Sequence, residues 1–155
     1  MRSIFFFVFC GYFSFAQTST FDTGNEGWSA DGDPTSQTPA WFPNNGNPGG
    51  HIRVTDASIG GTWYFVAPNY YHGNKCDAYG NWLRYDQFTS DTSNQQQFGG
   101  DPDVMLFGGG LTLIFDNVDN PDLEWTHYDI LLREDAGWRL NTLNGPVPTE
   151  AQFRA

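Results

Sequence analysis

The sequence predicts an all-β protein with the architecture of an antiparallel β-sandwich, and three observations support this prediction. Through the second half of the chain, short apolar runs alternate with clusters of Gly, Asn, Asp and Pro, which is the pattern of strands joined by turns. In residues 125–133, Tyr128 and Ile130 share one face of an extended chain while His127 and Asp129 share the other, as expected for a strand with one buried face. Aromatic residues make up 17% of the chain, a proportion that suits the core of a sandwich.

The first half of the chain is less regular. Residues 31–50 are rich in Pro, Gly and Asn and predict a long irregular loop, with Trp41–Phe42 as its apolar anchor. Residues 51–55 alternate between apolar and polar side chains and predict a strand. Residues 62–66 are apolar on both faces, so this strand is either central and covered on both sides or carries exposed aromatic side chains.

The second half contains the regular strands. They are predicted at residues 82–86, 103–107, 111–115, 125–133 and 138–140. The three glycines at residues 108–110 predict a tight turn between two of these strands, whereas the polar residues 87–102 predict a long connection.

The last residues predict the start of a helix. Thr149 is followed three residues later by Gln152, which is the spacing of a capping box. A helix of about six residues is not stable on its own in water, so we expect the printed sequence to stop inside the domain, with the helix cut short. A natural terminus that frays is the alternative.

The first residues predict a secretory signal peptide at residues 1–16. Met1–Ser3 carries one Arg, an apolar segment follows, and Ala16 closes it as a small residue at the cleavage site. The apolar segment is shorter than the roughly 20 residues that span a bilayer. We therefore expect a secreted, extracellular domain at residues 17–155, without a membrane span.

Cysteine usage and charge narrow the classes of partner. Cys10 would leave with the signal peptide, so Cys76 would have no partner for an intramolecular disulfide. We expect Cys76 to be a buried small apolar residue, with an odd thiol as the alternative. The formal net charge of −11, with only seven Lys and Arg, argues against nucleic acid or an anionic membrane as the partner.

The order of several motifs along the chain resembles the laminin IV (laminin B) domain family. These motifs are Phe21–Asp22, Gly27–Trp28, Tyr79–Tyr85, Asp103–Leu106, Trp125–Tyr128, Ala136–Trp138 and Pro148–Phe153. The resemblance implies an extracellular jelly-roll β-sandwich related to carbohydrate-binding modules, with no known catalysis. In that family the helix continues and further strands follow it, which also implies that this sequence stops inside the domain.

Asp-rich turns are candidates for a calcium site. Calcium takes six to eight oxygen ligands from carboxylates and carbonyls, and Asp116, Asn117 and Asp119 could supply several from one turn. The resemblance to jelly-roll modules, which often tie their first strand to their last through calcium, adds Asp22 and Asp33 as first-strand candidates. We therefore expect one structural calcium ion; the alternative is that each turn uses Asp and Asn for backbone reasons alone.

Aromatic residues in loops are candidates for a glycan-binding platform. Trp41, Tyr70, Tyr71 and Trp125 lie at loops or strand ends. Sugar rings stack on such side chains, while Asn, Asp and Gln bond the hydroxyls. The alternative is that these aromatics fill the core or clamp the long loops.

No recognisable catalytic motif is present. The sequence contains no H-E-x-x-H, G-x-S-x-G, Walker or dinucleotide motif. Glu124 and Glu134 flank a predicted strand and would lie roughly 30 Å apart, too far for a glycosidase pair. The sequence therefore predicts a non-catalytic binding or adhesion module whose partner is a glycan or an extracellular protein. A structural spacer in a larger extracellular protein is the second hypothesis, and a jelly-roll glycoside hydrolase or lyase is the third.

Overall fold

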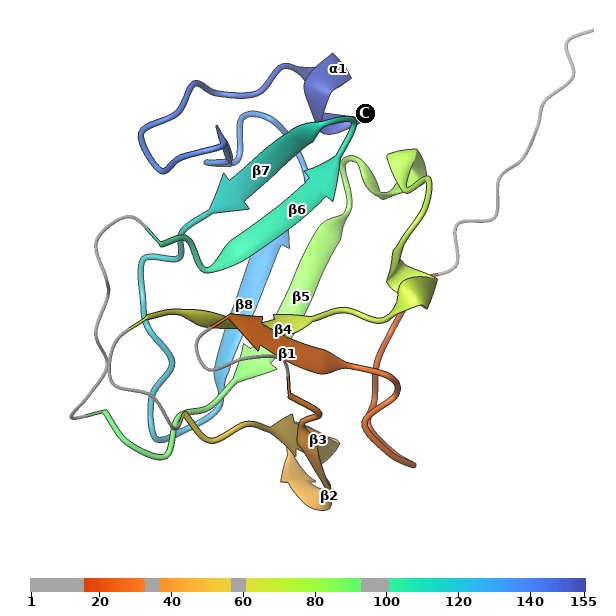
Figure 1. The fold of residues 1–155 in the computed structure, drawn as a ribbon, viewed down its shortest axis with the longest axis vertical. Coiled ribbons are helices and arrows are strands. Elements are labelled where there is room, and N and C mark those ends of the chain that lie inside the picture. The colour runs from red at the N-terminus through yellow and green to blue at the C-terminus, as the bar shows by residue number, and fades with distance from the viewer. Residues whose placement is uncertain (1–15, 33–36, 57–60, 93–100) are drawn as a thin grey trace, which may run out of the picture.

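The computed structural model describes residues 16–32, 37–56, 61–92 and 101–155 (Figure 1). The predicted signal peptide lies outside the described residues apart from Ala16. Nearly all regular structure in the described part of the chain is antiparallel β-strand, which confirms the all-β prediction. The strands pair within small separate sheets, and the jelly-roll order of strands stays an expectation.

Four antiparallel sheets hold the strands of the described residues. The first pairs β1 (Ser29–Gly32) with β4 (Trp63–Val66), and the second pairs β2 (Ala40–Gly46) with β3 (Gly49–Arg53). The third pairs β5 (Trp82–Gln87) with β8 (Thr126–Leu131), and the fourth has the order β6 (Val104–Gly108), β7 (Leu111–Phe115), β9 (Arg139–Leu140). The short helical turns η1 (Asn69–Tyr71) and η2 (Cys76–Ala78) connect β4 to β5, and the helix α1 (Glu150–Phe153) follows β9.

The core lies between the β5–β8 sheet and the β6–β7–β9 sheet (Figure 1). Its buried members are Leu113, Ile130, Trp138 and Leu140, and half-buried side chains from β5 and β6 pack against them. Trp138 is completely buried, and its indole N–H donates to the Leu131 carbonyl at 2.9 Å. Burying this large apolar side chain while bonding its polar group removes the usual cost of an unpaired buried donor.

The predicted alternation in the last long strand is confirmed. Tyr128 and Ile130 are buried, whereas His127 and Asp129 are exposed. The predicted tight turn is confirmed as well, because β6 and β7 are joined directly after Gly108. Gly109 and Gly110 have positive φ angles of 53° and 73°, which glycine adopts at little steric cost.

The prediction of one long irregular loop at residues 31–50 is wrong. β2 and β3 form an antiparallel hairpin within and beyond this segment, although residues 33–36 lie outside the described part. The pairing register shifts between Phe42 and Gly46, where Pro43 has no N–H to donate to a sheet. The bulged strand β2 lacks the clean alternation by which strands are recognised in sequence, whereas β3 overlaps the strand predicted at residues 51–55.

Two ambiguous predictions are resolved by the structure. β4 pairs only with β1 among the described strands, and its aromatic residues are half-buried on both faces, so it is not a fully covered central strand. Cys76 lies in η2 and is half-buried rather than buried. No helix in the described residues is both long and apolar enough to cross a bilayer.

The capping box at the end of the chain is confirmed. The Thr149 hydroxyl accepts from the Gln152 N–H at 3.3 Å, and the Gln152 side chain accepts from the Thr149 N–H at 3.0 Å. The short helix is not isolated, because the Phe153 ring packs edge-on against Trp138 with ring centroids 5.5 Å apart. Tertiary packing therefore supplies the stability that a helix of this length lacks in water.

Candidate ligand-binding site

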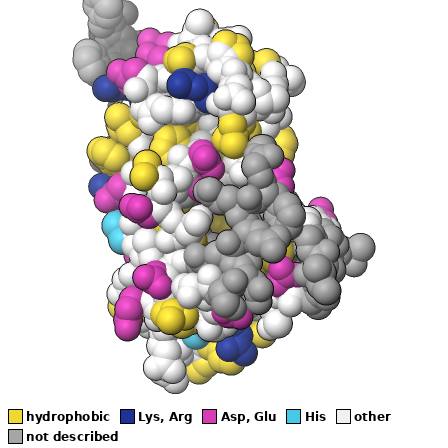
Figure 2. Space-filling model, turned by 90° about the vertical axis from the view of Figure 1, so that its left-hand side faces the viewer, with side chains coloured by type: hydrophobic (Ala, Val, Ile, Leu, Met, Phe, Trp, Pro, Cys, Tyr) yellow, Lys and Arg dark blue, Asp and Glu magenta, His cyan; other side chains and the backbone are white. Residues whose placement is uncertain are grey.

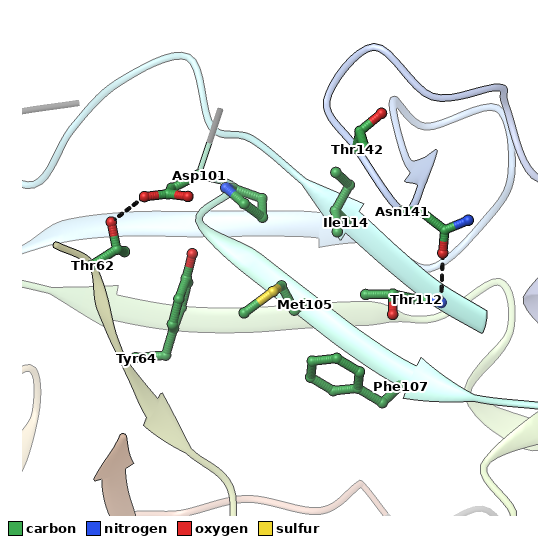
Figure 3. A pocket seen from close by; sticks show the side chains of 10 residues that line it. Thr62, Tyr64, Asp101, Met105, Phe107, Thr112, Ile114, Asn141 and Thr142 are labelled. Atoms are coloured by element: carbon green, nitrogen blue, oxygen red, sulfur yellow. Dashed lines mark hydrogen bonds between the residues drawn. The ribbon is translucent and has the colours of Figure 1, made fainter. Parts of the chain in front are cut away.

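A cavity of about 580 Å³ lies beside the face of β6 and β7 that is turned away from the core (Figure 3). Leu106 and Leu113 of these strands point into the core. Because side chains alternate along a strand, Met105 and its cross-strand partner Ile114 point to the other face and line the cavity. We call this space the outer-face cavity.

One side of the outer-face cavity is apolar. Ile114 is only 2% exposed and forms the apolar bottom of the cavity. Phe107 lies at the margin of the cavity and is 75% exposed. Tyr64 projects from β4 toward the same space, so the cavity lies between two sheets (Figure 3). The cavity is open on one side, and its volume falls within the range of about 300 to 1,000 Å³ that is usual for small-molecule sites.

The other side of the cavity is polar and partly ordered by hydrogen bonds. The Thr62 hydroxyl donates to the Asp101 carboxylate, which joins the residue before β4 to the segment before β6. The Asn141 side-chain oxygen accepts from the Thr112 N–H at 3.3 Å, and the Asn141 N–H donates to the Thr112 carbonyl at 2.9 Å. These bonds hold the Asn141 side chain at the margin, with its amide nitrogen turned away from Thr112 (Figure 3).

The electrostatic character of the cavity is negative. Asp101 lines it, and Lys, Arg and His are absent from its described lining. Burial, with the negative charges of Asp101 and Asp103, raises the pKa of Tyr64 to about 12, so its hydroxyl remains a hydrogen-bond donor even in alkaline solution. Figure 2 shows acidic side chains spread over the left-hand side of the molecule, with few basic ones between them.

The aromatic residues predicted to bind a ligand lie elsewhere. Tyr70 and Tyr71 belong to η1, with ring centroids 4.6 Å apart, and Tyr71 packs edge-on against Trp28 at 5.6 Å. Tyr70 is 43% exposed, and its hydroxyl is 2.6 Å from that of Ser19. This pair therefore fastens the first described residues to η1.

Trp41 lies in β2, and Trp125 contacts the β2–β3 hairpin from outside it. The Trp41 indole N–H donates to the Phe21 carbonyl at 2.6 Å. The Trp125 indole N–H donates to the Asn45 carbonyl at 3.1 Å, and its ring packs edge-on against His51 at 5.8 Å. Each indole thus bonds to a backbone segment that is distant in the sequence. The role of Trp41 and Trp125 in glycan binding stays a prediction.

Two of the predicted metal ligands in the turn after β7 make protein contacts, through a side-chain N–H or a backbone carbonyl and not through their side-chain oxygens. The Asn117 side-chain amide donates to the Tyr85 hydroxyl at 2.8 Å, and the Asp119 carbonyl accepts from the Tyr128 hydroxyl at 3.0 Å. The pKa of Asp116 is raised by burial and by the neighbouring charge of Asp103. This turn is thus tied to the core sheet through two tyrosines.

The other predicted metal ligands, Asp22 and Asp33, belong to the N-terminal part of the chain. Asp22 accepts a hydrogen bond from the Thr20 hydroxyl at 2.9 Å, and Asp33 lies outside the described residues. Within the described ranges, no three His, Cys, Asp or Glu side chains gather as a metal would require. Calcium binding stays a prediction, which melting temperatures measured in calcium and in chelator would test.

Sequence analysis missed the cavity residues, although one signal was available. Residues 104–107 are all apolar, so after one face has filled the core, Met105 and Phe107 remain on the opposite face. A strand that is apolar on both faces needs a second partner or exposes an apolar patch. No signal in the sequence indicated that Tyr64 would lie across from them.

The comparisons with known proteins agree with the C-terminal part of this architecture. A family model described as Laminin B (Domain IV) matches residues 64–154, which is more than half of the chain. The match begins at Tyr64 in β4 and includes every element from η1 to α1. Searches of curated proteins and of solved structures gave no match.

Proposed function

This chain belongs to the laminin B (domain IV) family, and we propose that it is an extracellular binding module that holds a glycan in the outer-face cavity. The family consists of non-catalytic structural domains that are typically extracellular. Family membership therefore supports a proposal of binding without chemistry. Secretion by the predicted signal peptide, and a place within a larger extracellular protein, belong to the same proposal.

The observation that carries the proposal is the exposed Phe107 beside a covered apolar floor and a polar margin. A sugar ring has a face of C–H groups and an edge of hydroxyls. The C–H face packs on aromatic side chains, and the hydroxyls bond to amide, hydroxyl and carboxylate groups. Phe107 and Tyr64 offer the first kind of surface, and Asn141, Thr142 and Asp101 offer the second.

A glycan array probed with the full chain tests this proposal. We expect binding to a defined set of glycans, and Phe107→Ala should weaken it about tenfold because an aromatic contact worth 1–2 kcal/mol is lost. Trp82→Ala is the matched control, since Trp82 is also an exposed aromatic, at 49%, but lies on β5 outside the cavity. An array without binding, or equal losses for the two variants, would contradict the proposal.

A further inference from the structure

Resting on the proposed function, we infer that the outer-face cavity selects neutral sugars and rejects sulfated or carboxylated ones. The inference follows from the kinds of polar group at its margin. Thr62, Asn141 and Thr142 are neutral donors and acceptors, which suit sugar hydroxyls, and Asp101 is anionic. Sulfate and carboxylate groups are normally bound by Arg or Lys, and the described lining contains neither.

A second carboxylate strengthens the exclusion. Asp103 accepts a hydrogen bond from the Asn117 N–H at 2.6 Å, which orients it between the turn after β7 and the start of β6. Its charge, like that of Asp101, acts on the Tyr64 hydroxyl inside the cavity. An anionic ligand would therefore meet repulsion from both carboxylates in a space that is partly shielded from solvent, where charges are screened less than at an open surface.

The net charge of the whole chain also disfavours anionic ligands. The formal net charge is −11, so a sulfated polysaccharide would be repelled during its approach as well as within the cavity. A neutral glycan carries no such penalty, and its hydroxyls can donate hydrogen bonds to the Asp101 carboxylate. The residue that repels anions is thus also an acceptor for the neutral ligand.

The test uses a glycan array on which neutral glycans are printed beside their sulfated or sialylated forms, such as N-acetyllactosamine with and without 6-sulfate. We expect the full chain to bind the neutral members. Asp101→Asn should raise binding of the charged members about fivefold, because one like charge is removed while the acceptor for Thr62 is kept. Raising NaCl from about 0.05 M to about 0.5 M should reduce the preference of the unmodified chain for neutral over charged glycans, because salt screens the repulsion.

The controls separate this inference from the proposed function. Asp77→Asn removes an exposed carboxylate in η2 that does not line the cavity, and it should leave the preference unchanged. Equal binding of charged and neutral members by the unmodified chain, or no effect of Asp101→Asn on their ratio, would overturn the inference alone. An array without binding to any glycan would instead reject the proposed function and the inference with it.

Discussion

The N-terminal region, residues 16–66, and the C-terminal region, residues 82–155, are held together by different kinds of interaction. The buried apolar residues of the C-terminal region are Leu113, Ile114, Tyr128, Ile130, Trp138, Leu140 and Pro148, whereas those of the described N-terminal region are Ala30 and Pro39. The N-terminal region relies instead on half-buried aromatic pairs, such as Phe42 stacked on His51 at 5.0 Å. It also relies on single hydrogen bonds from indoles to backbone carbonyls.

This difference separates a cooperative core from a set of local clamps. Contiguous apolar burial is the dominant favourable term in folding, so the C-terminal region should set the global stability. Side-chain clamps on loops stabilise only the segment that they touch, and such segments open locally before the domain unfolds. The family model begins at Tyr64, so its match covers the cooperative region and leaves out most of the clamped one.

The strongest test of the contrast removes the centre of the core. Trp138→Ala should lower the free energy of unfolding by about 3–5 kcal/mol, the range for large aromatic residues in cores. The variant loses the ring contacts with Phe115 at 5.3 Å and Phe153 at 5.5 Å, and the Leu131 carbonyl loses its indole donor while keeping the Arg133 N–H at 3.0 Å. Urea denaturation followed by circular dichroism measures this change in the full chain.

The matched variant in the N-terminal region is Trp28→Ala. Trp28 is half-buried and packs edge-on against Phe21 at 6.2 Å and Tyr71 at 5.6 Å. We expect the free energy of unfolding to fall by about 1–2 kcal/mol or less, because these contacts resemble isolated aromatic pairs. Equal losses for Trp28→Ala and Trp138→Ala would show that the two regions form one core and that the contrast is wrong.

The same contrast explains which predictions from the sequence succeeded. The strand around Tyr128 and the capping box of Thr149 depend on neighbours within a few residues, so the local pattern was sufficient to predict both. The strand at residues 51–55 was predicted and overlaps β3, but β2 was missed because Pro43 interrupts the alternation and the aromatic partners of the hairpin are distant in the chain. The outer-face cavity was missed for a related reason, since Tyr64 and Phe107 are brought together only by the packing of two sheets.

An effect of intermediate size is expected when a side chain that links the two regions is removed. Trp125→Ala deletes the hydrogen bond to the Asn45 carbonyl and the ring contacts with His51 and Phe88. We expect amide hydrogens of β2 and β3 to exchange about tenfold faster, because local opening becomes about 1.4 kcal/mol easier. Amides of β6 and β7 should be unaffected in hydrogen-exchange mass spectrometry.

Trp125→Phe serves as the control for that experiment. It keeps an aromatic ring for His51 but removes the indole donor, so it should show a smaller increase in exchange than the alanine variant. If exchange instead rises equally throughout β2, β3, β6 and β7, then Trp125 belongs to the global core rather than to a local clamp.

The smallest expected effect concerns the exposed face of the β5–β8 sheet. His127 lies between two carboxylates, with Nδ1 2.7 Å from Asp86 and Nε2 3.3 Å from Asp129, and Arg84 is bonded to Asp129. The hydrogen bond with Asp86, together with the charges of both carboxylates, raises the pKa of His127 above its usual range despite some desolvation. The pKa of Asp129 is lowered, mainly by its hydrogen bond with Arg84.

A raised pKa in the folded state means that protonated His127 stabilises the fold. This contribution is fully present below the unfolded-state pKa of about 6.5 and is lost as the pH rises through the higher folded-state value. His127→Gln should therefore lower the urea midpoint at about pH 5 and leave it unchanged at about pH 9. The loss should stay below about 1 kcal/mol, because His127 is half-exposed and solvent screens the pair. His72→Gln, an exposed histidine outside the sheet, is the control. A loss for His127→Gln as large as that of Trp138→Ala would mean that surface charges, and not the apolar core, distinguish the C-terminal region from the N-terminal one.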